Sequence, residues 1–185
     1  MELQSPAVAM IELRSISRGV KTADEMVKKA QVNLMEARTV CPGKYMIIIT
    51  GEVGPVEESY IKGKEIAGEM MIDEMFLPNA HWQLIPAMEA CVEVKEIVSL
   101  AIIETFSVAS VILSADAAAK MADVTLIELR MANGLGGKSF YTMTGELSEV
   151  EAATEAGVDI IEPAGTLVNR EIIPNPHEDI NLKLL

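Results

Sequence analysis

Apolar and polar positions along the first half of the chain alternate between a period of two and a helical period. A period of two indicates a strand, whereas apolar residues that recur every three or four positions indicate a helix. Gly54 and Pro55 mark the start of the second helix. The predicted elements are strands at residues 7–13, 32–40, 44–52 and 71–78, and helices at residues 19–30 and 54–70.

This order, βαββαβ, is that of the split-βαβ plan, in which an antiparallel sheet carries both helices on one face. The predicted fold class is therefore α+β, of the ferredoxin-like type. Because the helices cover only one face of the sheet, we expect its other face to be available to partners.

The second half of the chain repeats the first. Residues 9–38 match residues 101–130 at one constant spacing, and the strand that begins "GKYM" matches the one that begins "GKSF" after a loop that is longer by two residues. Near the ends of the halves "LPNAH" matches "IPNPH". We therefore predict two tandem domains, at residues 1–90 and 91–185, joined around residues 88–97.

Charge and hydropathy limit the possible partners. The formal net charge is −13 and the isoelectric point is near 4.6, so the chain repels the phosphate backbones of nucleic acids, which are excluded as partners. Half of the residues are apolar although only 4% are aromatic. Since mean hydropathy is positive in a chain of small domains, we expect neighbouring subunits to cover apolar surface.

Cysteine content and the start of the chain indicate the compartment. The chain has two cysteines, too few for a disulfide framework, and "MELQSPAVAM" lacks the basic and apolar regions of a signal peptide. A cytoplasmic location is expected. Residues 97–119 are apolar enough to mimic a membrane span, but Glu104 interrupts them and their match to the N-terminal half argues for a soluble domain.

Cys41 is the candidate for chemistry. It stands in "VCPGKYMIIIT", before a Pro-Gly turn, with no Cys-x-x-Cys partner and no histidine nearby, so one chain cannot build an ordinary metal site around it. Cys91, the other cysteine, lies at the joint between the domains and is interpreted as structural or incidental. In the second half Asn133 takes the place of Cys41, and "GLGGKS" lacks the full phosphate-binding pattern of a Walker loop.

The residues carry a resemblance to a known family. The segment "ADEMVKKAQV", repeated as "ADAAAKMADV" and followed by a strand, a Gly-Lys turn and "PNxH", resembles the shell domain of bacterial microcompartments. Two such units in one chain resemble the tandem-domain shell proteins, which form homotrimers shaped like hexamers. The stretch "TVCPGKY" is similar to the iron-sulfur shell proteins of propanediol-utilization compartments.

This resemblance implies a 4Fe-4S cluster at the central pore of a trimer, shared by three chains that each contribute Cys41, with one iron left without a protein ligand. The partners it implies are further copies of the chain, other shell proteins and enclosed redox enzymes. Lys28 and Lys120, which match a family lysine at the tile edge, are expected to contact neighbouring tiles, as are His81 and His177. The implied pore loops comprise Val40, Cys41, Pro42 and Gly43, and Asn133, Gly134, Leu135, Gly136 and Gly137.

The predicted function is that of a shell protein and not of an enzyme. Glu12 and Glu104 occupy equivalent points of separate domains, so nothing indicates that they share a catalytic cleft. The cluster would pass electrons across the shell or deliver clusters to enclosed enzymes. One alternative is a cluster-free tile whose pore conducts small metabolites, and a more distant one is a regulatory trimer that binds a small molecule between subunits.

Overall fold

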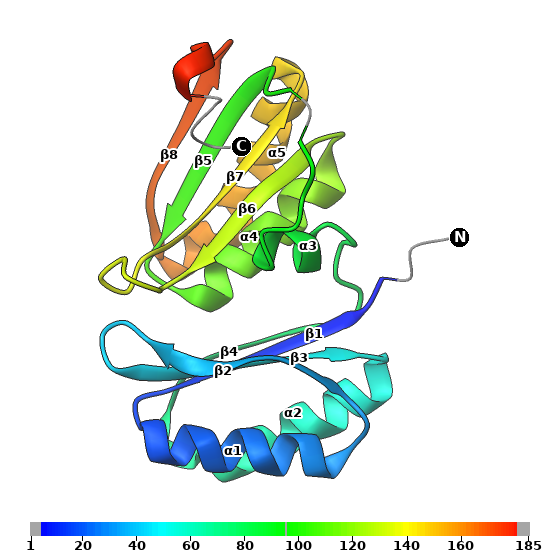
Figure 1. The fold of residues 1–185 in the computed structure, drawn as a ribbon, viewed down its shortest axis with the longest axis vertical. Coiled ribbons are helices and arrows are strands. Elements are labelled where there is room, and N and C mark those ends of the chain that lie inside the picture. Colours follow the sequence, from blue (N-terminus) through cyan, green and yellow to red (C-terminus); the bar gives the residue numbers. More distant parts are fainter. Residues whose placement is uncertain (1–4, 95, 181–185) are drawn as a thin grey trace. The chain divides into compact units, whose positions relative to one another are not determined.

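The computed structural model describes residues 5–94 and 96–180 (Figure 1). These residues form two compact units. The first comprises residues 5–82 together with the loop Ala132–Gly137, and the second comprises Gln83–Met131 and the residues from Lys138 onward. One loop of the second sequence repeat thus packs within the first unit.

The first unit is a four-stranded antiparallel sheet with two helices on one face (Figure 1). Its strand order is β2-β3-β1-β4. The elements are β1 (Ala7–Leu13), α1 (Ile16–Lys29), β2 (Asn33–Val40), β3 (Lys44–Gly51), α2 (Val53–Ala67), a 3₁₀ turn (Gly68–Met70) and β4 (Met71–Leu77).

The second unit repeats this arrangement with the strand order β6-β7-β5-β8. Its elements are α3 (Leu84–Met88), β5 (Ser99–Thr105), α4 (Val108–Met121), β6 (Thr125–Met131), β7 (Ser139–Gly145), α5 (Leu147–Ile161), a 3₁₀ turn (Glu162–Ala164) and β8 (Leu167–Pro174). The predicted fold class, two tandem α+β domains of βαββαβ order, is confirmed.

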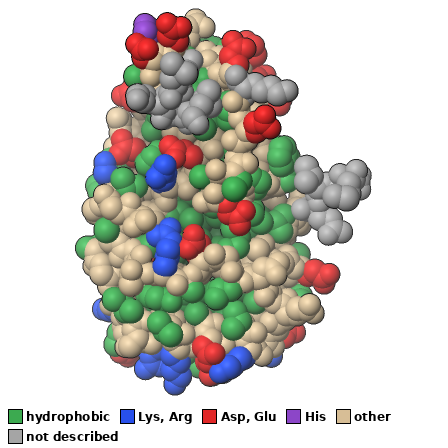
Figure 2. Space-filling view, viewed as in Figure 1, with side chains coloured by type: hydrophobic (Ala, Val, Ile, Leu, Met, Phe, Trp, Pro, Cys, Tyr) green, Lys and Arg blue, Asp and Glu red, His purple; other side chains and the backbone are tan. Residues whose placement is uncertain are grey.

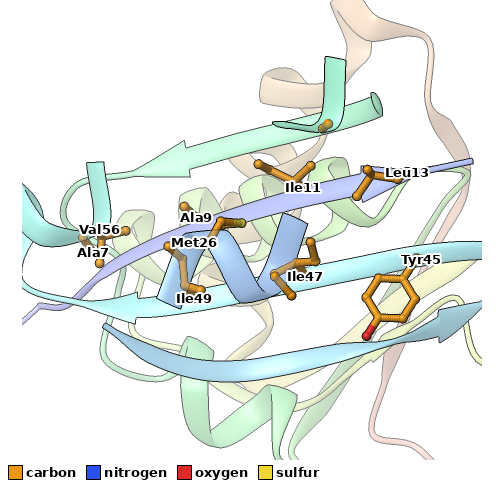
Figure 3. Packing of buried hydrophobic residues seen from close by; sticks show 11 residues of the cluster. Ala7, Ala9, Ile11, Leu13, Met26, Tyr45, Ile47, Ile49 and Val56 are labelled. Atoms are coloured by element: carbon orange, nitrogen blue, oxygen red, sulfur yellow. The ribbon is translucent and has the colours of Figure 1, made fainter. Parts of the chain in front are cut away.

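Small and aliphatic side chains form the core of the first unit. Alternate residues of β1 point toward the helices, as the period of two predicts, and pack with Met26 of α1 (Figure 3). The helices approach closely at Gly63 of α2, where an added Cβ would lie only 2.6 Å from the sulfur of Met26. The core residues of the sheet labelled in Figure 3 are Ala7, Ala9, Ile11, Leu13, Tyr45, Ile47 and Ile49.

Helix α1 begins earlier than the apolar period predicts. Its first residue is Ile16, three positions before the expected start, because the hydroxyl of Ser15 accepts a hydrogen bond from the amide of Arg18 at 3.3 Å. Ser107 caps α4 in the same way, through the amide of Ser110 at 3.0 Å. At α1 the serine cap places the start of the helix before the region where buried apolar residues recur.

Helix α3 is an element that the sequence pattern did not predict, since it has only five residues and contains Pro86. Gln83, just before it, bonds the edge of β6 through its side chain, which donates to the carbonyl of Val124 at 2.9 Å and accepts from the amide of Leu126 at 2.8 Å. These bonds satisfy backbone groups of an edge strand.

Residues 97–119, whose apolar character mimics a membrane span, contain strand β5 and most of α4. In the described part of the chain, no helix combines the length and the apolar character that crossing a membrane requires.

Candidate functional site

The turn that carries Cys41 is the three-residue connection of the β2–β3 hairpin. Val40 and Lys44 pair across its base, and Gly43 has a φ of +78°. Three-residue hairpin loops commonly end on a residue in this left-handed region, which glycine adopts without a steric penalty. The "CPG" sequence therefore suits a tight turn that places Cys41 directly after a strand.

The structure brings the second predicted loop against this turn. The amide of Cys41 donates a hydrogen bond to the carbonyl oxygen of Ala132 at 2.9 Å. Gly137, with a φ of +93°, lies so near that an added Cβ would be 3.4 Å from the Pro42 ring and 3.5 Å from the carbonyl oxygen of Cys41. Both loops belong to the first compact unit. That they line a pore stays a prediction.

The residues of the two loops differ in exposure. Val40 and Ala132 are buried at the bases of the loops, whereas Cys41 is half-buried and its thiol is free. Of the remaining residues of the predicted pore loops, Leu135 and Gly137 are half-buried. The others are exposed, namely Pro42, Gly43, Asn133, Gly134 and Gly136. The turn thus presents one thiol beside exposed backbone.

One chain does not supply a complete metal site. Among residues 5–94 and 96–180, no group of three or more His, Cys, Asp or Glu side chains is placed to hold a metal ion. Cys91 is exposed, and its sulfur donates to the carbonyl of Glu89 at 3.3 Å. Any cluster bound through Cys41 therefore needs ligands from outside this part of the chain.

An ion pair stands at the base of the Cys41 turn. The Lys44 ammonium lies 3.1 Å from the carboxylate of Glu12, which is only 1% exposed. Burial raises the pKa of Glu12, and the hydrogen bond from Lys44 and its charge oppose this shift. In the second unit Lys138 and Glu104 repeat the pair at 2.6 Å, with more exposure.

These pairs were not predicted from the sequence, which indicated only that Glu12 and Glu104 occupy equivalent points of separate domains. The sequence signal for these pairs is the Gly-Lys dipeptide that follows both loops. In each half the lysine stands at or just before the start of the strand that pairs with the glutamate's strand, and its presence in both halves indicates a repeated cross-strand contact.

The predicted tile-edge lysines lie in the last turns of equivalent helices. Figure 2 shows Lys and Arg side chains gathered over α1, where Lys28 pairs with Asp24. The hydrogen bond from this ammonium to Asp24 raises the pKa of Lys28. Lys120 of α4 forms the same i,i+4 pair with Asp116 at 2.6 Å.

The two predicted histidine contacts have different surroundings. His81 is half-buried, and its ring centroid lies 5.7 Å from that of the exposed Trp82. His177 is exposed, and its Nδ1 accepts a hydrogen bond from the amide of Asp179 at 3.2 Å. Contact of either histidine with another tile stays a prediction.

Comparison with protein families matches residues 7–80 and 99–176 to the BMC domain, one match for each unit. The chain is 39% identical to the bacterial microcompartment shell protein PduT of Citrobacter freundii over 95% of this chain and 96% of that protein. A crystal structure of a microcompartment protein from Desulfitobacterium hafniense is 44% identical, covers 96% of this chain with 98% of its own, and superposes with a TM-score of 0.91.

A more distant solved structure shares the fold alone. It is a fused permuted hexameric shell protein from the RMM microcompartment, 20% identical, with a TM-score of 0.64 over 86% of this chain and 85% of its own.

Proposed function

The chain belongs to the BMC-domain family of bacterial microcompartment shell proteins, and from this premise we propose that it forms closed trimers in which Cys41 of each chain would hold a shared 4Fe-4S cluster. The part it plays in the shell is structural rather than enzymatic. The cluster would add a redox role to one tile among others.

The observation that carries the proposal is the placement of Cys41. Its thiol is free and half-buried at the end of β2, in a turn whose backbone is tied to Ala132. A ligand thiol needs a fixed backbone and access to the metal, and the hydrogen bond supports the first of these while the partial exposure supports the second.

The donor set fits such a cluster only through symmetry. Iron-sulfur clusters are held by cysteine thiolates, usually four, and no group of several ligands occurs in the described part of one chain. A closed three-fold assembly repeats each residue three times around its axis. Three copies of Cys41 would supply three thiolates and leave one iron to solvent or a small ligand.

The residues next to Cys41 fix the shape of the turn and do not themselves bind the proposed cluster. Pro42 restricts the backbone after the ligand, and Gly137 adopts the positive φ that the second loop has beside Pro42. The amide of Cys41 is already donated to Ala132, so it is not a donor to cluster sulfur. When bound, a 4Fe-4S cluster accepts and releases single electrons.

In this proposal the trimer packs with other shell proteins into the wall of a microcompartment. A cluster held there would pass electrons between enclosed redox enzymes and the outside, or would be delivered to those enzymes. An incompletely ligated cluster beside exposed residues Pro42 and Gly43 would be sensitive to oxygen.

The test is anaerobic purification followed by iron and sulfide assay and electron paramagnetic resonance. We expect about four irons per trimer in the native protein and none in Cys41→Ser, with the trimer intact in both. Cys91→Ser is the matched control, because Cys91 is also a free thiol but lies outside the turn, and it should retain the iron.

Two outcomes would overturn the cluster. Absence of iron from the native protein after anaerobic reconstitution would leave a shell tile whose pore passes metabolites. Discrete trimers that bind a small molecule and never form sheets would instead indicate a regulatory protein.

A further inference from the structure

A cavity of about 470 Å³ lies in the second unit, lined by α5, the 3₁₀ turn that follows it and β8. Small-molecule sites generally have volumes of about 300–1,000 Å³. Figure 1 labels α5 and β8, the helix and the strand that carry most of the lining residues. None of the residues that line the cavity belongs to the Cys41 turn or to the loop beside it, so a ligand here would be independent of the cluster.

The first unit fills the equivalent place with its own side chains. The rings of Tyr60 of α2 and Phe76 of β4 stack with centroids 5.6 Å apart. The Tyr60 hydroxyl donates to Glu74 at 2.9 Å, and the Lys64 ammonium donates to the same carboxylate at 2.8 Å while lying 5.1 Å from the Tyr60 ring centroid. An aromatic ring and an ammonium thus occupy this place, and their polar groups are paired.

Helix and strand registers identify the corresponding residues of the second unit. Helices α2 and α5 both have 15 residues and begin at Val53 and Leu147. Counted from these first residues, Tyr60 and Thr154 hold the same position. By the same count Lys64 corresponds to Val158.

The strand positions follow from pairing. Glu74 pairs with Ile11 of β1, and Arg170 pairs with Ile103, the repeat equivalent of Ile11. Phe76 corresponds to Ile172 in the same way. The second unit therefore lacks the two rings, the ammonium and the carboxylate that occupy this place in the first.

A polar group is left without a partner in the resulting cavity. Thr154 lines the cavity and is only 2% exposed, yet its hydroxyl makes no hydrogen bond within the described part of the chain. A buried hydroxyl without a partner is destabilising, so its presence in a cavity wall points to a ligand atom that would satisfy it.

The charged groups of the wall favour a cation. Four carboxylates and one guanidinium, that of Arg170, line the cavity, and none of them forms an ion pair with another residue that the structure describes. The excess of negative charge attracts cations. The carboxylates are those of Glu151, Glu155, Asp159 and Glu162.

The geometry of the wall favours an organic cation over a metal ion. The carboxylates are spread along α5 and the following turn, and within residues 5–94 and 96–180 no set of three converges to hold a metal ion. Val158 and Ile172 add apolar wall to the cavity. Arg170 is suited to stack on an aromatic face.

We propose that this cavity binds an organic ammonium ion with an apolar or aromatic stem, which takes the place that Tyr60 and Lys64 occupy in the first unit. The ammonium lies among the carboxylates of α5, the stem contacts Val158 and Ile172, and a polar atom of the ligand bonds the Thr154 hydroxyl. The ammonium comes either from a free amine or from a lysine side chain of a partner protein.

The test is calorimetric titration of the intact protein with tyramine, which carries a phenol and a primary amine, and with N-acetyl-lysine amide, which represents a protein lysine. We expect saturable binding of one amine per chain that weakens as salt is added. Tighter binding of tyramine identifies a free amine as the source, and tighter binding of the lysine derivative identifies a protein.

Variants locate the binding. Thr154→Tyr restores the ring of the first unit and should weaken binding about tenfold or more. Asp159→Asn, an exposed change that leaves folding intact, should weaken it about threefold. Glu65→Gln, the same kind of change at the equivalent position of α2, is the matched control and should leave binding unchanged. Absence of saturable binding of both amines, or equal binding by native protein, Thr154→Tyr and Asp159→Asn, would overturn the proposal.

Discussion

The ammonium of Lys44 lies 3.1 Å from the buried carboxylate of Glu12, and this pair joins the first residue after the Cys41 turn to the central strand β1 of the sheet. Lys138 and Glu104 repeat the relationship in the second unit, with a side-chain exposure of 32% for Glu104 against 2% for Glu12. The duplication thus provides a buried pair and an exposed one of the same design.

Loss of the lysine should have unequal costs in the two units. Lys44→Met leaves the buried Glu12 without its cation and should lower the free energy of unfolding by about 2–4 kcal/mol. Lys138→Met removes the partner of a carboxylate that water reaches, so the expected loss is below about 1 kcal/mol. Urea unfolding monitored by circular dichroism measures both, and equal losses would contradict the assigned difference in burial.

Glu12 should make stability decrease as the pH rises. Because burial raises its pKa above the ordinary value of 4.5, the folded chain binds more protons than the unfolded chain in the range between 4.5 and the raised value. Its favourable contribution is complete below pH 4.5 and is lost as the pH rises through the folded pKa.

Glu12→Gln removes this titration while it keeps the shape of the side chain. The stability of the native protein relative to this variant should be greatest below pH 4.5 and decline above it, as measured by urea unfolding across pH 4 to 8. Glu104→Gln serves as the control. A relative stability of the Glu12 variant that is constant with pH would show that Glu12 does not titrate abnormally.

Two glycines of the second loop allow the cost of backbone strain to be distinguished from the support that this loop gives to Cys41. Gly134 and Gly137 have φ values of +72° and +93°, so alanine at either should cost about 1 kcal/mol of stability. Only Gly137 contacts Pro42 and Cys41, whereas nothing lies within 4 Å of a Cβ at Gly134. Relief of the strain at Gly137 would move backbone that lies against Pro42 and Cys41, so Gly137→Ala should lower the iron content of the proposed cluster and Gly134→Ala should not. Equal iron in both variants would remove the supporting role assigned to Gly137.

The tile-edge role of the helix lysines predicts a defect of assembly. The double variant Lys28→Glu and Lys120→Gln should remain folded and trimeric but fail to form sheets in electron micrographs. Both lysines are exposed, and the glutamine amide can still donate a hydrogen bond to the buried Asp116. Lys21→Glu, an exposed change on the same helix α1, is the control. Normal sheets from the double variant would place the tile contacts elsewhere.

Periodicity and repetition in the sequence were sufficient for the architecture. The strands expected at residues 7–13, 32–40 and 44–52 match β1, β2 and β3 to within a residue at each end, and the matched halves predicted two units of the same fold. The greater length of the second loop was also predictable from the aligned repeats. The strand pairing agrees with it, because Arg38 and Arg130 hold equivalent positions before the loops diverge. These features depend on near neighbours in the chain, which a sequence displays directly.

The features that give the candidate sites their character depend on residues that are distant in the chain. The sequence indicated two pore loops, at residues 40–43 and 133–137, but not the bond from Cys41 to Ala132, which exists only because tertiary packing brings the two loops together. The cavity beside Thr154 likewise results from the combined volumes of residues on α5 and β8, which the first unit fills with Tyr60 and Phe76. The sequence alone determined the elements and their duplication, whereas the tertiary structure decided which side chains meet and where space is left, because packing sums contributions that no local pattern contains.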